Sequence, residues 1–139
     1  MTKTRVPTQK RSIEKREKII KAGFDLFCEK GYYKTNTAEI AKYAGVSTGA
    51  LYSYFEDKRQ IFIEAFHQHI DKISSSLLQQ LANLSEALDL STFIEKWIEI
   101  YIDLYAKSNH ALVQLRLVIV DDEEVNHHFS DLEDTYFSN

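Results

Sequence analysis

The chain has few of the residues that interrupt helices or cross-link a fold. Its 139 residues include one proline, four glycines and one cysteine. A lone cysteine, Cys28, excludes a disulfide within the chain and is typical of proteins from reducing compartments. Apolar residues recur mostly at intervals of three and four, so the sequence predicts an all-α fold. Cys28 follows Phe24 and Phe27 on an apolar stretch, and we expect a buried, inert thiol.

Long apolar runs are also absent. The most apolar stretch, residues 111–120, is interrupted by Gln114 and Arg116. It is too short to span a bilayer. The first ten residues are polar and basic and contain no signal-peptide pattern. We therefore expect a soluble, cytoplasmic protein without a membrane partner.

Acidic residues are scarce only in the first part of the chain. Residues 1–59 contain 13 Lys and Arg against 7 Asp and Glu, a net charge of +6. Residues 60–139 contain 4 against 14, a net charge of −10. A cationic front and an anionic back indicate that only the front contacts phosphate.

Residues 36–58 contain the signals of two short helices joined by a turn. Asn36 can cap the first helix, with Glu39 three residues later to return the hydrogen bond. Gly45 provides the turn, and Ser47 can cap the second helix. Leu51 then closes a small core together with Phe55. This spacing predicts a helix-turn-helix, which places its second helix in the major groove of DNA.

The remaining pattern predicts further helices. A first helix runs from a cap at Ser12 to Lys30 and ends at Gly31. A long helix follows Asp57, with an apolar stripe from Ile61 to Leu77, and Ser74, Ser75 and Ser76 lie on its surface. After a break within residues 83–92, capped by Ser91 or Thr92, a fifth helix extends from Phe93 to about Asn109. It is apolar on most sides, so we expect it to be central in its bundle. Residues 115–120 favour a strand by propensity, but a single strand has no partner, so we predict helix.

These ordered motifs resemble the TetR family of bacterial transcription regulators. The resemblance covers about residues 12–66. It rests on residues 20–27, Gly31 and Tyr32, Ile40 and Ala41, residues 44–47, residues 49–55, and Lys58. It implies a three-helix DNA-binding head, a long connecting helix and a C-terminal helical bundle. We expect residues 1–57 to form the basic tail and the head, and residues 58–139 to form the effector-binding and dimerisation domain.

The sequence departs from the family in three ways. Gly23 stands where alanine is usual, at a cost of about 1 kcal/mol in helix stability unless close packing requires it. Thr37 replaces a β-branched apolar residue. The chain ends at Asn139, whereas family members continue through helices that form most of the dimer interface. We expect the C-terminal bundle to be truncated, in an unusually short member or in a fragment.

The expected DNA contacts lie in the helix-turn-helix. Thr48, Gly49 and Ala50, at the exposed start of the second helix, face base edges, and their small side chains predict modest direct readout with a contribution from DNA shape. Tyr52 and Tyr54 resemble the phosphate-contacting pair of the family, and at least one of them should be exposed. The full expected set is Asn36, Ser47, Thr48, Gly49, Ala50, Tyr52, Ser53, Tyr54 and Lys58. Lys3, Arg5, Lys10 and Arg11 form either an arm on the DNA or a disordered, solubilising tail.

The second part offers candidates for an effector pocket. They are Phe66, His69, Ile70, Trp97, Tyr101 and Tyr105, each of which core packing would also explain. We expect no cofactor and no metal, because neither His67 with His69 nor His127 with His128 has metal-ligand spacing on a helix. The acidic residues 121–124 could bind a metal, but a solvated corner or a first helical turn is more typical.

The resulting hypothesis is a DNA-binding transcriptional regulator that responds to a small-molecule effector. The resemblance implies a repressor acting as a homodimer on a two-fold operator. The alternative is a helical ligand-binding or interaction module that does not bind DNA, against which the basic front, Tyr52, Tyr54 and Lys58 argue. We identify no catalytic residues and predict that the protein is not an enzyme.

Overall fold

The computed structural model describes residues 2–84 and 89–137, and within these ranges it forms six α-helices and no strand. The all-α prediction is confirmed. The helices are α1 (Thr2–Lys30), α2 (Thr37–Ala44), α3 (Thr48–Tyr54), α4 (Lys58–Leu84), α5 (Leu90–Asp121) and α6 (Glu123–Phe137). None of these helices is long and apolar enough to cross a membrane.

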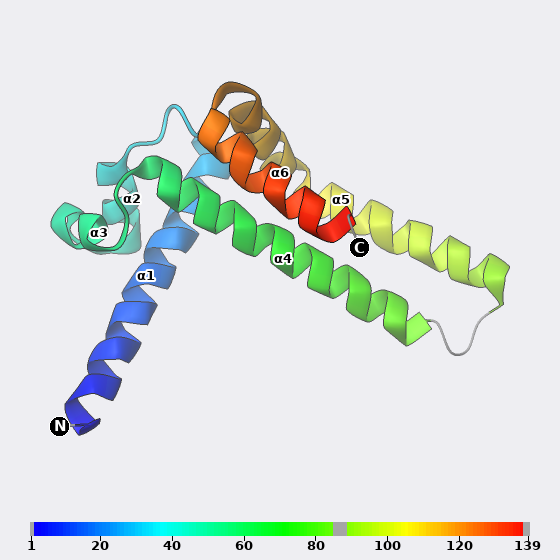
Figure 1. Ribbon diagram of the computed structural model, residues 1–139, viewed down its shortest axis with the longest axis horizontal. Helices are drawn as coiled ribbons and strands as arrows, with labels where there is room; N and C mark the ends of the chain where they lie inside the picture. Colours follow the sequence, from blue (N-terminus) through cyan, green and yellow to red (C-terminus); the bar gives the residue numbers. More distant parts are fainter. Residues whose placement is uncertain (1, 85–88, 138–139) are drawn as a thin grey trace.

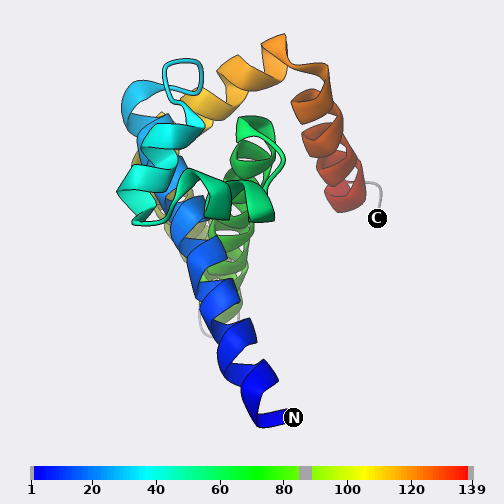
Figure 2. The ribbon, with the colours of Figure 1, turned by 90° about the vertical axis from the view of Figure 1, so that its left-hand side faces the viewer.

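The six helices form a head attached to a long helical pair. Helices α2 and α3 lie beside α1 at one end of α4, and α4 and α5 run antiparallel along most of their length (Figure 1). At the head, α5 turns sharply into α6, which runs back beside α4. The N-terminal part of α1 extends away from the other helices in both views (Figure 2).

One continuous core joins the head to α4 and to the turn between α5 and α6. Its fully buried side chains include Phe27 of α1, Phe62 and Phe66 of α4, Val118 of α5 and Val125 of α6. Phe62 packs edge-on against Phe27 and stacks on Phe66, with ring centroids 5.3 and 4.3 Å apart. Such aromatic pairs contribute about 0.5–1.5 kcal/mol each beyond the burial of their area. The first turns of α4 are therefore part of the packed core of the head.

Gly23 lies where α1 contacts α4. A Cβ atom at this position would lie 2.6 Å from Cγ2 of Ile61, well inside van der Waals contact. The close packing of α1 against α4 therefore leaves no room for a side chain at this position, which explains a glycine within a helix.

The beginning of α1 differs from the prediction. The helix extends to Thr2 and does not begin after Ser12. The Ser12 hydroxyl donates a hydrogen bond to the Tyr54 hydroxyl (3.0 Å), so it connects α1 to α3 and does not cap a helix.

The prediction for the fifth helix was partly wrong. The break before it is present, but the cap is Asp89, whose carboxylate accepts from the Thr92 amide (2.8 Å). The helix continues past Asn109 to Asp121, and residues 115–120 are helical as predicted. It is also less central than expected: Trp97 and Tyr101 are 41% and 53% exposed. Helix α5 has apolar residues on more of its surface than the other described helices cover.

The acidic run forms the corner between α5 and α6. Asp122 Oδ1 accepts from the amides of Glu124 (3.0 Å) and Val125 (3.2 Å) and so caps α6. Glu123 and Glu124 occupy its first turn, where negative charge is favourable. This is the solvated corner that the sequence predicted.

Cys28 of α1 is half-buried, and burial, with Asp25 nearby, raises the pKa of its thiol to about 11.

Candidate nucleic-acid interface

The two helices of the predicted motif are capped as the sequence indicates. The Asn36 side chain accepts from the Glu39 amide (2.8 Å), and the Ser47 hydroxyl accepts from the Ala50 amide (3.0 Å). Between the helices, Gly45 has φ of +76°, a left-handed conformation that glycine adopts without strain. Each helix thus begins on a local cap, α2 ends at Gly45, and together they form a helix-turn-helix.

The first turn of α3 presents small groups to solvent. Thr48 and Gly49 are exposed, whereas Leu51 is fully buried and holds the helix against the core. A Cβ atom at Gly49 would meet only the Ser47 hydroxyl, at 4.0 Å. Internal packing does not require this glycine, and the surface beside it is open to the close approach of a partner.

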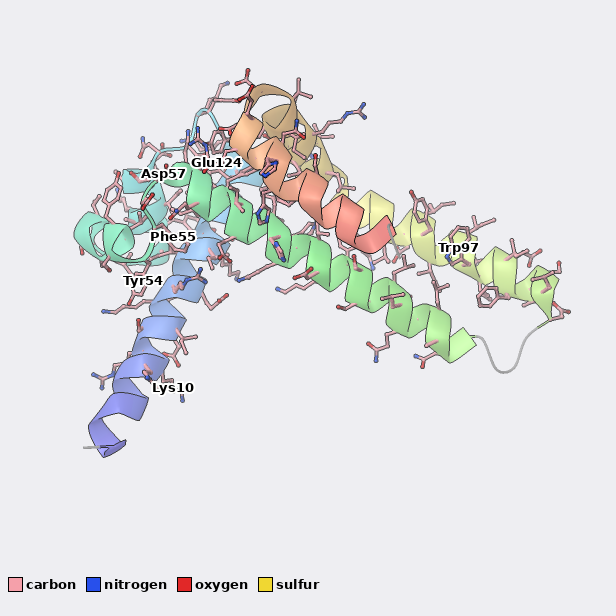
Figure 3. The ribbon with its side chains drawn as sticks, in the orientation of Figure 1. Lys10, Tyr54, Phe55, Asp57, Trp97 and Glu124 are labelled. Atoms are coloured by element: carbon pink, nitrogen blue, oxygen red, sulfur yellow. The ribbon has the colours of Figure 1, made fainter. Side chains whose placement is uncertain are left out.

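The two tyrosines of α3 lie on different sides of the helix. Tyr52 is 50% exposed, and its hydroxyl lies 2.7 Å from the Thr37 hydroxyl at the start of α2. Tyr54 is half-buried and accepts the hydrogen bond from Ser12. Tyr54 and Phe55 therefore face α1 at the end of α3 (Figure 3). The prediction that at least one tyrosine is exposed is confirmed.

Lys58 already has partners within the protein. Its Nζ donates to the Tyr32 carbonyl oxygen (2.8 Å) and lies 4.1 Å from the centroid of the Tyr32 ring. Burial lowers the pKa of this ammonium group. The side chain connects the start of α4 to the segment between α1 and α2, and its contact with phosphate stays a prediction.

Sequence reasoning missed two contacts that position the motif. Lys30 at the end of α1 forms an ion pair with Glu39 of α2. This pairing is the main cause of a lowered pKa for the Glu39 carboxyl. The second contact is Thr37 with Tyr52, which ties α3 to the start of α2. Neither pairing follows from spacing on one helix, because each joins two elements.

The basic N-terminal segment continues α1 as helix to Thr2. Lys10 and Arg11 are exposed, and Lys10 lies on the extended part of α1 (Figure 3). The side chains of Lys3 and Arg5 lie outside the described residues.

Comparison with known sequences identifies the motif. The family described as bacterial regulatory proteins of the tetR family matches residues 19–65, which include all of α2 and α3. The chain therefore contains the DNA-binding domain of the tetR family. Its DNA-binding head thus has the helix-turn-helix of that family.

Curated relatives match the chain over about half of its length. The transcriptional regulator HbdR of Aromatoleum sp. is 37% identical over 76 residues, which are 55% of this chain and 33% of HbdR. The transcriptional repressor BepR of Brucella suis is 46% identical over 55 residues, 40% of this chain and 26% of BepR. The chain spans about a quarter to a third of the length of these relatives.

Solved structures match the fold over most of the chain. A putative TetR-family regulator from Mesorhizobium loti has a TM-score of 0.79 at 23% identity, with 87% of this chain and 61% of that chain covered. A putative TetR-family regulator from Syntrophomonas wolfei has a TM-score of 0.65 at 28% identity, with the same coverage. The arrangement of helices beyond the head is therefore shared with these solved structures.

The candidate effector residues are not gathered around one cavity. Ile70 and Tyr101 line a largely apolar hollow of about 260 Å³ between α4 and α5. His69 lines a different hollow, of about 410 Å³, between α1 and α4. Phe66 is fully buried in the core. Trp97 lies near the end of the helical pair away from the head (Figure 3).

The side chain of Tyr105, the sixth candidate, lies outside the described residues. His69 Nε2 is buried and has no hydrogen-bond partner among the described residues. Burial, with Lys72 nearby, lowers the pKa of His69, which favours the neutral ring.

Proposed function

We propose that this chain is a sequence-specific DNA-binding transcriptional regulator of the TetR family, and that it represses transcription as a homodimer in the cytoplasm. The observation that carries the proposal is the first turn of α3, where Thr48 and Gly49 are exposed above the buried Leu51. This is the part of a helix-turn-helix that enters the major groove. The names of HbdR and BepR, a regulator and a repressor, support the same function. The proposal assigns no catalytic activity.

The contacts with DNA would be divided between bases and phosphates. Thr48 and Ala50 can contact a thymine methyl group, Thr48 can also hydrogen-bond a base, and Gly49 lets the backbone approach. Ser53 is a weaker candidate, because its hydroxyl donates to the Ala50 carbonyl oxygen (2.6 Å). The residues proposed for phosphate and backbone contacts are Asn36, Ser47, Tyr52, Tyr54 and Lys58.

Regulation would act through the hollow between α4 and α5. Its lining is mainly apolar, with Ile70, Leu77 and Leu112 among its residues, and this favours a small, largely apolar effector. Because the first turns of α4 pack into the core of the head, a shift of α4 would move the head. In a dimer, two heads must fit half-sites about 34–36 Å apart, so a small shift would weaken binding.

The test is a DNA-binding measurement on the untagged full chain. Fluorescence anisotropy with DNA that flanks its own gene, repeated over a range of salt concentrations, should show saturable and salt-sensitive binding. Tyr52→Phe should weaken binding to specific and random DNA alike, whereas Thr48→Ala should change the preference between sequences. Tyr101→Phe, on α5, is the matched control and should change neither.

Oligomeric state is measured on the same sample by light scattering. A dimer that shows no salt-sensitive DNA binding would favour the alternative, a ligand-binding or interaction module. A monomer that binds random DNA weakly would retain the DNA-binding function and contradict the proposed dimer.

A further inference from the structure

His67 of α4 and His128 of α6 face each other across the contact between these helices. Nδ1 of His67 lies 3.0 Å from Nε2 of His128, and the ring planes are inclined by 55°. The two residues are 61 positions apart in the chain. The fold therefore creates a pair of imidazoles that neither helix contains alone.

The distance between the two nitrogens suits a shared metal ion. Imidazole nitrogens bind first-row transition metals at about 2.0–2.1 Å, so two nitrogens 3.0 Å apart subtend about 95° at such an ion. This angle is close to that between adjacent ligands in the square-planar or octahedral sites of Cu²⁺ and Ni²⁺. Tetrahedral Zn²⁺ would need the nitrogens about 3.3 Å apart, a separation that a small ring rotation provides.

We propose that His67 and His128 together bind one divalent transition-metal ion between α4 and α6. The ion would be Cu²⁺, Ni²⁺ or Zn²⁺, all of which accept imidazole ligands. Within the described residues, no group of three or more His, Cys, Asp or Glu side chains could hold a metal. Water fills the remaining coordination positions of the ion.

Asp71 orients the first of these ligands. Its Oδ2 lies 3.2 Å from Nε2 of His67, one helical turn away on α4. A proton on Nε2, donated to this carboxylate, leaves Nδ1, the nitrogen on the side of His128, unprotonated and able to bind the ion. Proteins commonly fix metal-binding histidines in this way, with a carboxylate behind the ring.

Packing and an ion pair position the second ligand. Val125 and Phe129 of α6 are 0% and 8% exposed in the core, and they fix which face of α6 meets α4. At the corner before α6, Asp122 pairs with Arg59 of α4. His128 is thus held against α4 by contacts that do not involve the metal, so the ion would meet a preformed pair of ligands. Its binding would further fasten α6 to α4.

The test is isothermal titration of the untagged full chain with NiCl₂, ZnCl₂ and CuCl₂, and with MgCl₂ as a control ion that prefers oxygen ligands. The buffer is held above the ordinary pKa of histidine, because the ligands must be neutral. We expect one transition-metal ion per chain and no binding of Mg²⁺. His67→Gln and His128→Gln should each weaken binding at least tenfold. Asp71→Asn, which keeps both ligands, should weaken it roughly tenfold.

The matched controls are His127→Gln and His110→Gln, which alter exposed histidines outside the pair and should leave affinity unchanged. Circular dichroism checks that every variant is folded. Electron paramagnetic resonance of the Cu²⁺-loaded wild-type chain gives a second readout that needs no variant. Coupling to two imidazole nitrogens is expected.

Three outcomes would overturn the metal site: no binding of any of the three ions at millimolar concentration, unchanged affinity in the His67→Gln and His128→Gln variants, or coupling to a single nitrogen. In each case the pair is an imidazole–imidazole hydrogen bond that fastens α6 to α4. None of these results depends on DNA binding, so the test is independent of the proposed function.

Discussion

Arg59, the second residue of α4, donates from Nε to Oδ2 of Asp122 at 2.8 Å and so joins the head to the corner between α5 and α6. The guanidinium group also contacts Glu124, which lies beside the head at the start of α6 (Figure 3). Next to this pair, the Tyr33 hydroxyl donates to Asp121 (2.5 Å), and this hydrogen bond is the main cause that raises the pKa of Tyr33 to about 12. Polar contacts thus join the corner between α5 and α6 to the start of α4. Through these contacts a movement of α5 and α6 would be transmitted to the head.

Replacing Asp122 by alanine should loosen this joint. The substitution removes both the cap of α6 and the partner of Arg59. Loss of an N-cap alone costs about 0.5–2 kcal/mol, and we expect a decrease of about 1–2 kcal/mol in the free energy of unfolding, measured with urea. Asp103→Ala is the control, because it breaks only the exposed ion pair with Lys107 and should cost less than about 0.5 kcal/mol. Equal losses in the two variants would contradict the role of the corner.

The contribution of Asp122 should also depend on pH. Burial alone would raise the pKa of its carboxyl, but hydrogen bonds from Arg59 and from the Val125 and Glu124 amides outweigh burial and lower it. A carboxyl whose pKa is lower in the folded state stabilises the protein above its unfolded pKa, about 3.9. That contribution disappears as pH falls through the folded value. The difference in unfolding free energy between wild type and Asp122→Asn should therefore stay constant from about pH 7 to pH 5 and shrink below about pH 4. A difference that grows on acidification would show that the ionised carboxylate is not what stabilises the corner.

The head could be predicted because its signals are local. Asn36 and Ser47 each bond an amide three residues further on, and Gly45 needs only its own left-handed backbone. Such signals can be recognised in the sequence alone, and the structure confirms each of them.

The errors concern contacts between distant residues. Ser12 resembles a helix cap by sequence, but its partner is Tyr54, 42 residues away. Within residues 110–121 no glycine or proline stops α5, so it continues to Asp121. His67 and His128 look unrelated in the sequence and meet only because α6 folds back onto α4. Side-chain pairs of this kind depend on packing and register, which the pattern of one chain does not determine.

Gly23 allows a second test of packing. Gly23→Ala would gain about 1 kcal/mol in helix propensity, but the new methyl group would clash with Ile61, and overpacking of this kind costs about 1–3 kcal/mol or more. We expect a net decrease in the free energy of unfolding. Gly49→Ala is the matched control, since a methyl group there meets open space, and it should stabilise the chain by up to about 1 kcal/mol.

The partner of Gly23 can be tested in the same series. Ile61→Ala removes the atom that would clash, so the double variant Gly23→Ala/Ile61→Ala should be less destabilised than the sum of the two single variants. Strict additivity would show that the contact between α1 and α4 does not explain the glycine.

A substitution at Lys58 can distinguish a structural role of this side chain from a role in DNA binding. If its ammonium group leaves the Tyr32 carbonyl and reaches a phosphate, Lys58→Met should weaken binding to every DNA sequence and reduce the slope of log affinity against log salt by about 0.9. Methionine keeps an apolar chain over the Tyr32 ring, so the loss of charge is tested with little loss of packing. Lys72→Met, about 21 Å further along α4, is the control and should leave the slope unchanged. An unchanged slope in Lys58→Met would remove Lys58 from the phosphate contacts and leave it as the lysine that fastens α4 to the segment before α2.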